Sequence, residues 1–327
     1  MAGQADSSQG AQHSAPPSQR KLISVVIPVY RSERSLGPLV ERLDAVLGQM
    51  DYDAEVVLVD DRSPDESWRV MVDLKERYPG LLKIARLERN GGQHNAICCG
   101  FTLCKGDIVV TMDDDLQNPP EEIPKLVAAV ESGFDLAIGA YDSKKHSKGR
   151  NLGGQLIDGV LRRIFGLRSD FQLTSYRAVK GAVVRRLRHV NTPFPYVTAL
   201  LFSNAATRTN VPVRHDARPF GQSNYSLRNS VSLALNLLLN YSLIPLQFVG
   251  AMVLFSVVLT GVFGLITLVR GLMGEVSIQG WASTIVLICT VGTQMMFSML
   301  ILLIYVTRIN HQLNVPVMKQ AIEEFHD

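Results

Sequence analysis

The chain has 327 residues, enough for one large domain or for one domain with an appendage. Its formal net charge of +3 lacks the basic surplus of nucleic-acid-binding domains, so nucleic acid is not an expected partner. The four cysteines, Cys98, Cys99, Cys104 and Cys289, lack zinc-site spacing. They indicate small apolar fillers in a reduced compartment and exclude a disulfide framework.

The first part of the chain changes character at about residue 20. Residues 1–20 lack apolar periodicity and predict a disordered tail, and without an apolar h-region they are not a secretory signal peptide. Beyond them, short apolar segments alternate with helical patterns. We expect strands at 22–29, 55–59, 82–87, 107–112 and 135–139, and helices at 36–49, 65–77, 94–104 and 120–131. This alternation predicts an α/β domain over residues 21–224, with a mostly parallel sheet and helices on both faces.

Polar side chains follow three of the predicted strands. They are Pro28 to Tyr30 after the first strand, Asp60 and Asp61 after the second, and Asp113 to Gln117 after the fourth. Ligands of such sheets bind at the carboxyl ends of the strands, so these side chains predict one cleft. The chain contains neither a G-x-G-x-x-G nor a Walker A motif, which disfavours a Rossmann dehydrogenase and a P-loop enzyme.

The acidic stretch after residue 112 is the most informative of the three. Asp113, Asp114 and Asp115 are adjacent, and Gln117 follows two positions later. Like charges this close repel one another unless a cation neutralises them, and an all-oxygen ligand set suits Mg²⁺ or Mn²⁺. The alternative is a solvated acidic turn before a helix, because Pro119 and the acids after it form a good helix start.

Membrane-related patterns begin after residue 140. A basic loop at 141–151 precedes an amphipathic segment at 152–165, which suits an anionic membrane surface, although an ordinary surface helix is the alternative. Residues 225–242 predict a juxtamembrane helix that leads into the first of two apolar spans.

The two spans, 243–269 and 281–307, contain no Asp, Glu, Lys, Arg or His. Each would be about 40 Å long as a helix, enough to cross a bilayer core of about 30 Å. Residues 270–280 form the linker and 308–327 a tail. The distribution of Lys and Arg predicts that the catalytic domain and both termini are cytoplasmic and the linker external. Gln294 in the second span predicts a helix–helix contact.

The order and spacing of these segments resemble the family 2 glycosyltransferases of the GT-A fold. Within that family they are most similar to the polyprenyl-phosphate sugar transferases, which act on undecaprenyl (bactoprenol) or dolichol phosphate. The similar segments are VVIPVY, LVDDRSPD, LERNGGQHNAICCGF, MDDDLQNPPEEIP and ARPFGQSNYS, which precede the apolar hairpin. The resemblance covers about residues 20 to 310.

The resemblance implies a role for each matching position. A nucleotide-sugar pocket would include Pro28, Tyr30, Glu33, Asp60, Asp61, Asn90, Gln93, Asp113 and Asp114. Asp115 and Gln117 would hold Mg²⁺ or Mn²⁺, and Asp113, Asp115 and Asp170 would be the catalytic acids. The lipid phosphate would be bound by Arg162, Arg163, Arg168, Arg218 and Ser223. For Asp170, the alternative is a simple turn residue.

The implied reaction is an inverting, metal-dependent transfer of a sugar from a nucleotide diphosphate sugar, expected to be UDP-linked. The acceptor would be undecaprenyl or another polyprenyl phosphate at the cytoplasmic face of a bacterial inner membrane, for envelope glycan or lipid A modification. A phosphate monoester is largely a dianion at pH 7, so it does not require a strong base. Relatives form homotetramers, so a homo-oligomer within membrane lipids is expected.

This chain departs from the family pattern at two positions. Gln172 and Asn224 stand where relatives carry Arg and Lys, so two positive charges near the phosphates are absent. Arg177 and the basic residues at 144–150 are the candidate replacements. His94 lies at the start of a predicted helix, where the positive helix end lowers its pKa. We expect it to cap or pack, and the alternative is a catalytic base. His215 is expected in a strand with a structural role.

Two other functions compete with this reading. A processive polysaccharide synthase is disfavoured, because neither Trp68 nor Trp281 lies in a Q-x-x-R-W motif and two spans are few for a secretion channel. A non-catalytic membrane scaffold that binds nucleotide or lipid is compatible with the two missing charges. The intact Asp113, Asp115 and Gln117 favour an enzyme.

Overall fold

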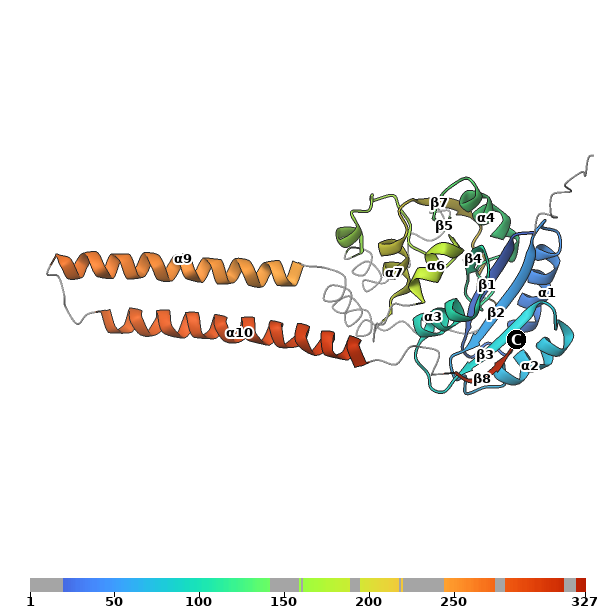
Figure 1. Ribbon diagram of the computed structural model, residues 1–327, viewed down its shortest axis with the longest axis horizontal. Coiled ribbons are helices and arrows are strands. Elements are labelled where there is room, and N and C mark those ends of the chain that lie inside the picture. Colours follow the sequence, from blue (N-terminus) through green and yellow to red (C-terminus); the bar gives the residue numbers. More distant parts are fainter. Residues whose placement is uncertain are drawn as a thin grey trace, which may run out of the picture.

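A computed structural model describes residues 20–141, 159, 161–188, 195–217, 219, 244–273, 280–314 and 322–327. It consists of an α/β domain and two long helices that extend away from the domain side by side (Figure 1). The predicted basic loop, the juxtamembrane helix and nearly all of the N-terminal tail lie outside these residues.

The α/β domain is built on an eight-stranded sheet with the order β7-β5-β6-β4-β1-β2-β3-β8. Its strands are β1 (Leu22–Val29), β2 (Asp53–Asp60), β3 (Leu82–Leu87), β4 (Ile108–Thr111), β5 (Leu136–Tyr141), β6 (Arg177–Lys180), β7 (Arg208–Val213) and β8 (Ile322–His326). The pairs β1–β2, β1–β4, β2–β3 and β5–β7 are parallel, whereas β6 is antiparallel to both β4 and β5. All five predicted strands are present, and the parallel centre agrees with the sequence pattern.

Helices cover both faces of the sheet, as predicted. They are α1 (Leu36–Leu47), α2 (Ser67–Arg77), α3 (Gln93–Leu103), the 3₁₀ turn η1 (Pro120–Glu122), α4 (Ile123–Glu131), α6 (Gly181–Leu187) and α7 (Val197–Asn204). In Figure 1, α3, α6 and α7 lie on the side of the sheet that faces the two long helices, and α1 and α2 lie on the other.

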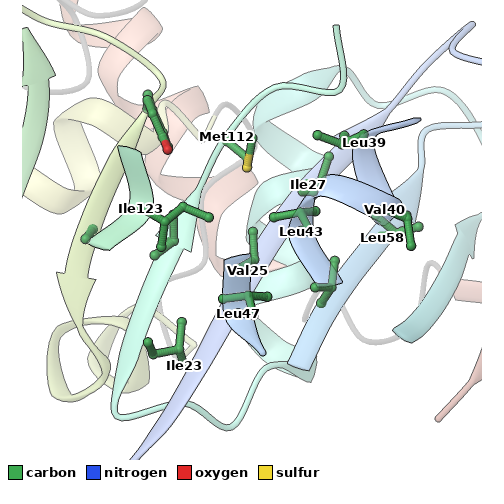
Figure 2. Close-up of a cluster of buried hydrophobic side chains, with 14 of the residues drawn as sticks. Ile23, Val25, Ile27, Leu39, Val40, Leu43, Leu47, Leu58, Met112 and Ile123 are labelled. Carbon is green, nitrogen blue, oxygen red and sulfur yellow. The ribbon is translucent and has the colours of Figure 1, made fainter. Parts of the chain in front are cut away.

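Successive side chains of β1 point to opposite faces of the sheet, and apolar side chains on both faces explain why helices cover both. Val25 and Ile27 point into one apolar cluster together with Leu39 and Leu43 of α1 (Figure 2). Val26, between them, belongs to the second cluster, which includes side chains of α3, α6 and α7. A strand that is buried on both faces is apolar at nearly every position, and in β1 the one polar residue is Ser24.

The position of α3 on the sheet depends on Gly100. A Cβ atom at this position would collide with the side chain of Val26 on β1. Glycine therefore allows the helix to approach the strand closely, and this fixes where the N-terminus of α3 lies relative to the carboxyl ends of β1 and β2.

The two long helices are α9 (Ile244–Leu272) and α10 (Trp281–Asn314). Each contains a candidate membrane span, Leu246–Ile266 with a mean hydropathy of 2.4 and Thr290–Thr307 with 1.6. Only 6% of either apolar window is buried, which differs from the core helix of a soluble protein. The Gln294 side chain accepts a hydrogen bond from the hydroxyl of Ser256 and donates one to the carbonyl of Met252. The predicted helix–helix contact at Gln294 is therefore confirmed.

The structure of the C-terminal segment was not predicted. Residues 308–327 were expected to form a tail, whereas α10 continues to Asn314 and residues 322–326 form β8. Strand β8 pairs antiparallel with β3 and completes that edge of the sheet. The isolated sequence IEEFH gave no strand signal, because its acidic residues are poor strand formers and the partner edge lies far away in the chain.

Candidate active site

The acidic stretch forms a tight turn directly after β4. Its three aspartates are partly exposed, whereas Met112 and Leu116 on either side are buried. Leu116 has a φ of 62°, in the left-handed region that costs a residue with a side chain about 1–2 kcal/mol. The Gln117 N–H donates to Asp115 Oδ1 at 3.1 Å. Burial of the Leu116 side chain offsets the cost of a turn that brings Asp115 and Gln117 together.

Asp113 connects three separate elements. It accepts hydrogen bonds from Gln93 Nε2 at 2.6 Å, at the start of α3, and from Ser175 Oγ at 2.5 Å, just before β6. Two predicted site residues, Asp113 and Gln93, are therefore in direct contact. Ser175 was missed, because nothing in its local sequence shows that β6 returns next to β4.

Asp114 faces a different neighbour, the loop after β1. Its Oδ2 accepts hydrogen bonds from the Tyr30 N–H at 3.0 Å and from the Ser32 hydroxyl. Burial raises the pKa of Asp114 to about 7, and the neighbouring carboxylates of Asp113 and Asp115 add to the rise. In this structure Asp114 holds the β1 loop in place; a direct contact with nucleotide stays a prediction.

The two aspartates at the end of β2 differ in their surroundings. Asp61 is buried and accepts two backbone hydrogen bonds, from the Gly91 N–H at 2.7 Å and the Gly92 N–H at 2.8 Å. Burial raises the Asp61 pKa although these two bonds lower it. Gly92 has a φ of 85°, a conformation open to glycine, so the turn before α3 needs this residue.

Asp60 is fully buried, and its charge is balanced by an arginine. Its Oδ1 accepts a hydrogen bond from the Ser63 N–H at 3.0 Å, and its Oδ2 lies 3.2 Å from Arg86 Nε. The angle at this ion pair is not that of a hydrogen bond, so within the described residues Oδ2 has no hydrogen-bond donor. This buried carboxylate oxygen therefore has an acceptor capacity that no described residue uses.

The remaining predicted pocket residues lie around this edge. Pro28 is the penultimate residue of β1, and Tyr30 is exposed beside Arg31, whose guanidinium carbon lies 5.3 Å from the ring centroid. Glu33 Oε2 accepts a hydrogen bond from the Glu66 N–H at 3.2 Å, and Asn90 is exposed.

The position of His215 was predicted incorrectly. It lies beyond the end of β7 at Val213, not in a strand. Its Nε2 is 3.4 Å from Gln117 Nε2, and its ring stacks on Tyr141 with centroids 4.1 Å apart. The Asp216 N–H donates to the Gln117 carbonyl at 2.9 Å. The chain after β7 therefore returns to the acidic turn and brings an imidazole to the predicted metal ligand Gln117.

Three of the predicted acceptor residues, Arg163, Arg168 and Asp170, are exposed, and Arg162 is partly exposed. Arg162 donates to the carbonyls of Arg168 and Phe171, at 2.5 and 2.7 Å, so its guanidinium stabilises its own turn. Arg168 donates twice to Asp170, at 3.2 Å each. Arg163 is exposed. Arg218 and Ser223 lie outside the residues that the structure describes, as does Asn224.

Gln172 has a structural role that an arginine would not fill in the same way. Its Oε1 accepts a hydrogen bond from the Tyr141 N–H at 3.0 Å, and its Nε2 donates to the Tyr141 carbonyl at 2.9 Å. An amide both accepts and donates, whereas a guanidinium only donates. The Gln172 side chain therefore pairs with both backbone groups of Tyr141, the last residue of β5.

Arg177 and His94 are packed in the interior beside the site. Arg177 donates to the Ser175 carbonyl and to Thr198 Oγ1, at 3.2 Å each, and burial lowers its pKa. The His94 ring meets Tyr196 edge-on with centroids 4.6 Å apart. Burial, and to a lesser extent Arg177, lowers the pKa of His94 to about 4. These contacts fit the packing role expected for His94.

The donor set at the acidic turn fits a divalent cation that shares its ligands with a substrate. Within the described ranges, no three His, Cys, Asp or Glu side chains gather as a complete metal site. The turn instead combines the carboxylates of Asp113 and Asp115 with the Gln117 amide, next to His215. Mg²⁺ is usually held by one or two carboxylates together with waters and substrate phosphates, and carboxylates are what this turn supplies.

Comparisons with known proteins identify a matching family and several relatives. Residues 24–188 match the model of glycosyl transferase family 2. The undecaprenyl-phosphate 4-deoxy-4-formamido-L-arabinose transferase of Edwardsiella ictaluri is 35% identical over 227 residues, which are 69% of this chain and 70% of that protein. The transferase of the same name from Pseudomonas fluorescens is 36% identical over 227 residues, 69% of this chain and 67% of that one.

Among solved structures, glucosyl-3-phosphoglycerate synthase from Mycobacterium tuberculosis is similar, in a complex with Mn²⁺, UDP and glucosyl-3-phosphoglycerate. It has a TM-score of 0.45 and 19% identity, and the match covers 67% of this chain and 78% of that one. TarS of S. aureus has a TM-score of 0.44 and 20% identity, with 67% and 40% covered.

Proposed function

The chain belongs to glycosyltransferase family 2, and on this basis we propose that it transfers a sugar from a nucleotide diphosphate donor to undecaprenyl phosphate or a similar polyprenyl phosphate. The resemblance seen in the sequence motifs is thereby confirmed at the level of the family. The relatives of about 35% identity, which are named for transfer to undecaprenyl phosphate, support the acceptor. The observation that carries the proposal is the contact of Asp113 with Gln93 and Ser175, which assembles residues from three elements at one sheet edge.

The donor would lie along the carboxyl ends of β2, β1 and β4. Asp60 Oδ2 is the buried acceptor for a base or ribose donor, and UDP is the expected nucleotide. Asp61 shapes the Gly91–Gly92 turn against which the nucleotide would lie. Gln93 and Ser175 orient the Asp113 carboxylate toward the sugar.

The diphosphate would reach the acidic turn. Asp115 and Gln117 would hold Mg²⁺ or Mn²⁺, with His215 as an additional nearby donor. When bound, such a cation stabilises the negative charge of the departing diphosphate. Asp114 keeps the β1 loop in contact with the turn, so that Tyr30 and the acidic stretch stay on the same side of the site.

The acceptor chemistry follows from the charge of a lipid phosphate. One phosphate oxygen forms a bond to the anomeric carbon while the bond from that carbon to the nucleotide diphosphate breaks, and the diphosphate leaves with the electron pair. A single displacement inverts the configuration at this carbon. The attacking dianion carries no proton on the reacting oxygen, so no strong base is needed. Asp170, paired with Arg168, would orient the acceptor, and Arg163, Arg218 and Ser223 would bind its phosphate.

The hairpin of α9 and α10 would anchor the enzyme in the bacterial inner membrane. Residues 270–280 would face the outside, and the α/β domain with both termini would be cytoplasmic, where nucleotide sugars are made. The exposed apolar surface of both helices supports contact with lipids or with further copies of the chain, consistent with the homo-oligomer expected from the family.

The test is a direct assay of the full-length chain, purified in detergent. It is incubated with undecaprenyl phosphate, Mg²⁺ or Mn²⁺ and a panel of UDP- and GDP-sugars, and the lipids are analysed by mass spectrometry. We expect one glycosyl residue per lipid, loss of activity with EDTA, and loss in Asp115→Asn. The control Asp51→Asn changes an exposed aspartate in the turn before β2, at the opposite end of the strands, and should be fully active.

Each competing function predicts a different result. A processive synthase would add many sugars to its product, and a scaffold would bind nucleotide without turnover. Unchanged transfer in Asp115→Asn, or in the presence of the chelator, would exclude the metal role assigned to the acidic turn.

A further inference from the structure

Strand β8 places the C-terminal segment close to the carboxyl ends of the strands, where the donor nucleotide is proposed to bind. It pairs antiparallel with β3, so that Ile84 lies opposite His326 and Leu87 lies opposite Ile322. Since β3 runs toward the carboxyl edge of the sheet, the first residues of β8 lie at that edge. In Figure 1, β8 lies beside β3 on the outer border of the sheet. This edge is the one at which β2 ends with Asp60 and is followed by Asp61.

Glu323 makes the important contacts of β8 at this edge. Its carboxylate forms an ion pair with Arg62, and its Oε2 lies 4.0 Å from Arg86 Nε. Arg62 directly follows Asp61, and its φ of 58° places a residue with a side chain in the left-handed region. One carboxylate on β8 therefore contacts both cations that flank the aspartate pair.

Arg86 in turn links Glu323 to the buried Asp60. Its Nε is 3.2 Å from Asp60 Oδ2, and its guanidinium carbon lies 5.5 Å from the centroid of the Trp68 ring. The Arg86 side chain is only 21% exposed and Asp60 is fully buried, so salt and water screen this pair weakly. Arg86 is therefore the cation that balances the charge of Asp60 at its buried Oδ2.

We propose that Glu323 is a positioning residue for the nucleotide-base subsite and acts through Arg86 and Arg62. This inference rests on the proposed function, in which Asp60 accepts a hydrogen bond from the donor nucleotide. Glu323 helps to hold the Arg86 guanidinium in the position in which its Nε lies 3.2 Å from Asp60 Oδ2. It also fixes Arg62, and with it the loop that carries Asp61. The C-terminal strand is then a working part of the donor site.

Strand β8 also connects the donor site to the membrane hairpin, because it follows α10 closely in the chain. Ile322 follows Asn314, the last residue of α10, by eight positions, which span at most about 28 Å of extended chain. The α/β domain is thus connected to the hairpin at both ends of the pair of helices, through the segment before α9 and through β8.

The test compares Glu323→Gln with Glu324→Gln in the full-length protein. The two residues are neighbours on one strand and both are acidic, but they differ in pairing: Glu324 lies opposite Arg86, whereas Glu323 lies where the pairing with β3 shifts register. Glu324 has its only described ion contact with His326, at 4.0 Å, so it serves as a matched control. The measured quantities are kcat, the KM for the nucleotide sugar, the KM for undecaprenyl phosphate, and the binding of UDP with Mn²⁺ by calorimetry.

We expect Glu323→Gln to raise the KM for the nucleotide sugar and the dissociation constant of UDP by about two- to fivefold, the range typical of partly exposed ion pairs. The kcat and the KM for the lipid should stay as in the wild type. Glu324→Gln should match the wild type in all four quantities, and Glu323→Asp, which keeps the charge, should restore much of the binding.

Several results would overturn the proposal. One is a Glu323→Gln protein that binds UDP like the wild type. Another is an equal loss in both variants, or a loss of kcat with lipid and nucleotide KM unchanged, because either would indicate a general effect on the fold. If Glu323→Gln does not fold, Arg62→Gln, which removes the ion pair from its other side, decides by the same binding measurement: UDP binding as in the wild type would overturn the proposal. A wild-type protein that neither binds nor turns over any nucleotide sugar would instead refute the proposed function.

Discussion

Asp61 offers the sharpest test of how the site is built. A structural role in the Gly91–Gly92 turn and a role as a ligand contact alone predict different results for the ligand-free protein. Its carboxylate accepts hydrogen bonds from the N–H groups of Gly91 and Gly92, at 2.7 and 2.8 Å. In Asp61→Ala both N–H groups lose their acceptor. Hydrogen bonds to a charged group contribute about 1.5–3 kcal/mol each, and removal of a buried, desolvated carboxylate returns part of that. We therefore expect a local loss of about 2–4 kcal/mol.

This loss should appear where the turn meets α3. Hydrogen exchange of the ligand-free protein should become faster at the amides of residues 91 to 96, by a factor of about 30 to 1,000 for the free energy above. Exchange in β1 and β4 should change little. Asp61→Asn, which keeps one acceptor oxygen, should show a smaller effect, and the exposed Asp51→Asn should show none. Unchanged exchange at these amides in Asp61→Ala would refute the structural role and leave Asp61 as a ligand contact alone.

Three further changes test the surroundings of the site. Ser175→Ala removes the 2.5 Å hydrogen bond to Asp113, and kcat/KM should fall by about tenfold, the equivalent of one hydrogen bond to a charged group, with thermal stability nearly unchanged. Gly100→Ala places a methyl group against β1 and should lower stability by about 1–3 kcal/mol, measured by thermal unfolding, whereas Gly37→Ala in open space should stabilise by up to about 1 kcal/mol. The pKa of His94, lowered from 6.5 to about 4, means that the unfolded chain binds the proton more readily, so stability should decrease by up to about 3 kcal/mol as the pH falls from about 6.5 to about 4. His94→Gln should flatten this pH dependence, and an unchanged slope would contradict it.

The sequence by itself determined the local elements and the chemistry at their ends. The largely apolar sequence of β1 predicts a strand that is buried on both faces, and the polar residues after β1, β2 and β4 predict a shared edge. Both follow from short-range physics, since periodicity and the direction of parallel strands are properties of neighbouring residues. The two apolar helices, free of charged residues over 27 positions, are predictable for the same reason.

Only the tertiary structure decided which side chains meet. Ser175 reaches Asp113 because β6 runs antiparallel beside β4, and His215 reaches Gln117 because the chain returns after β7. Strand β8 depends on the free edge of β3, more than 230 positions earlier in the chain. Contacts between segments this far apart depend on the packing of the whole domain. The local sequence does not predict them. The sequence of the C-terminal segment therefore gave no indication that Glu323 lies beside Arg62 and Arg86.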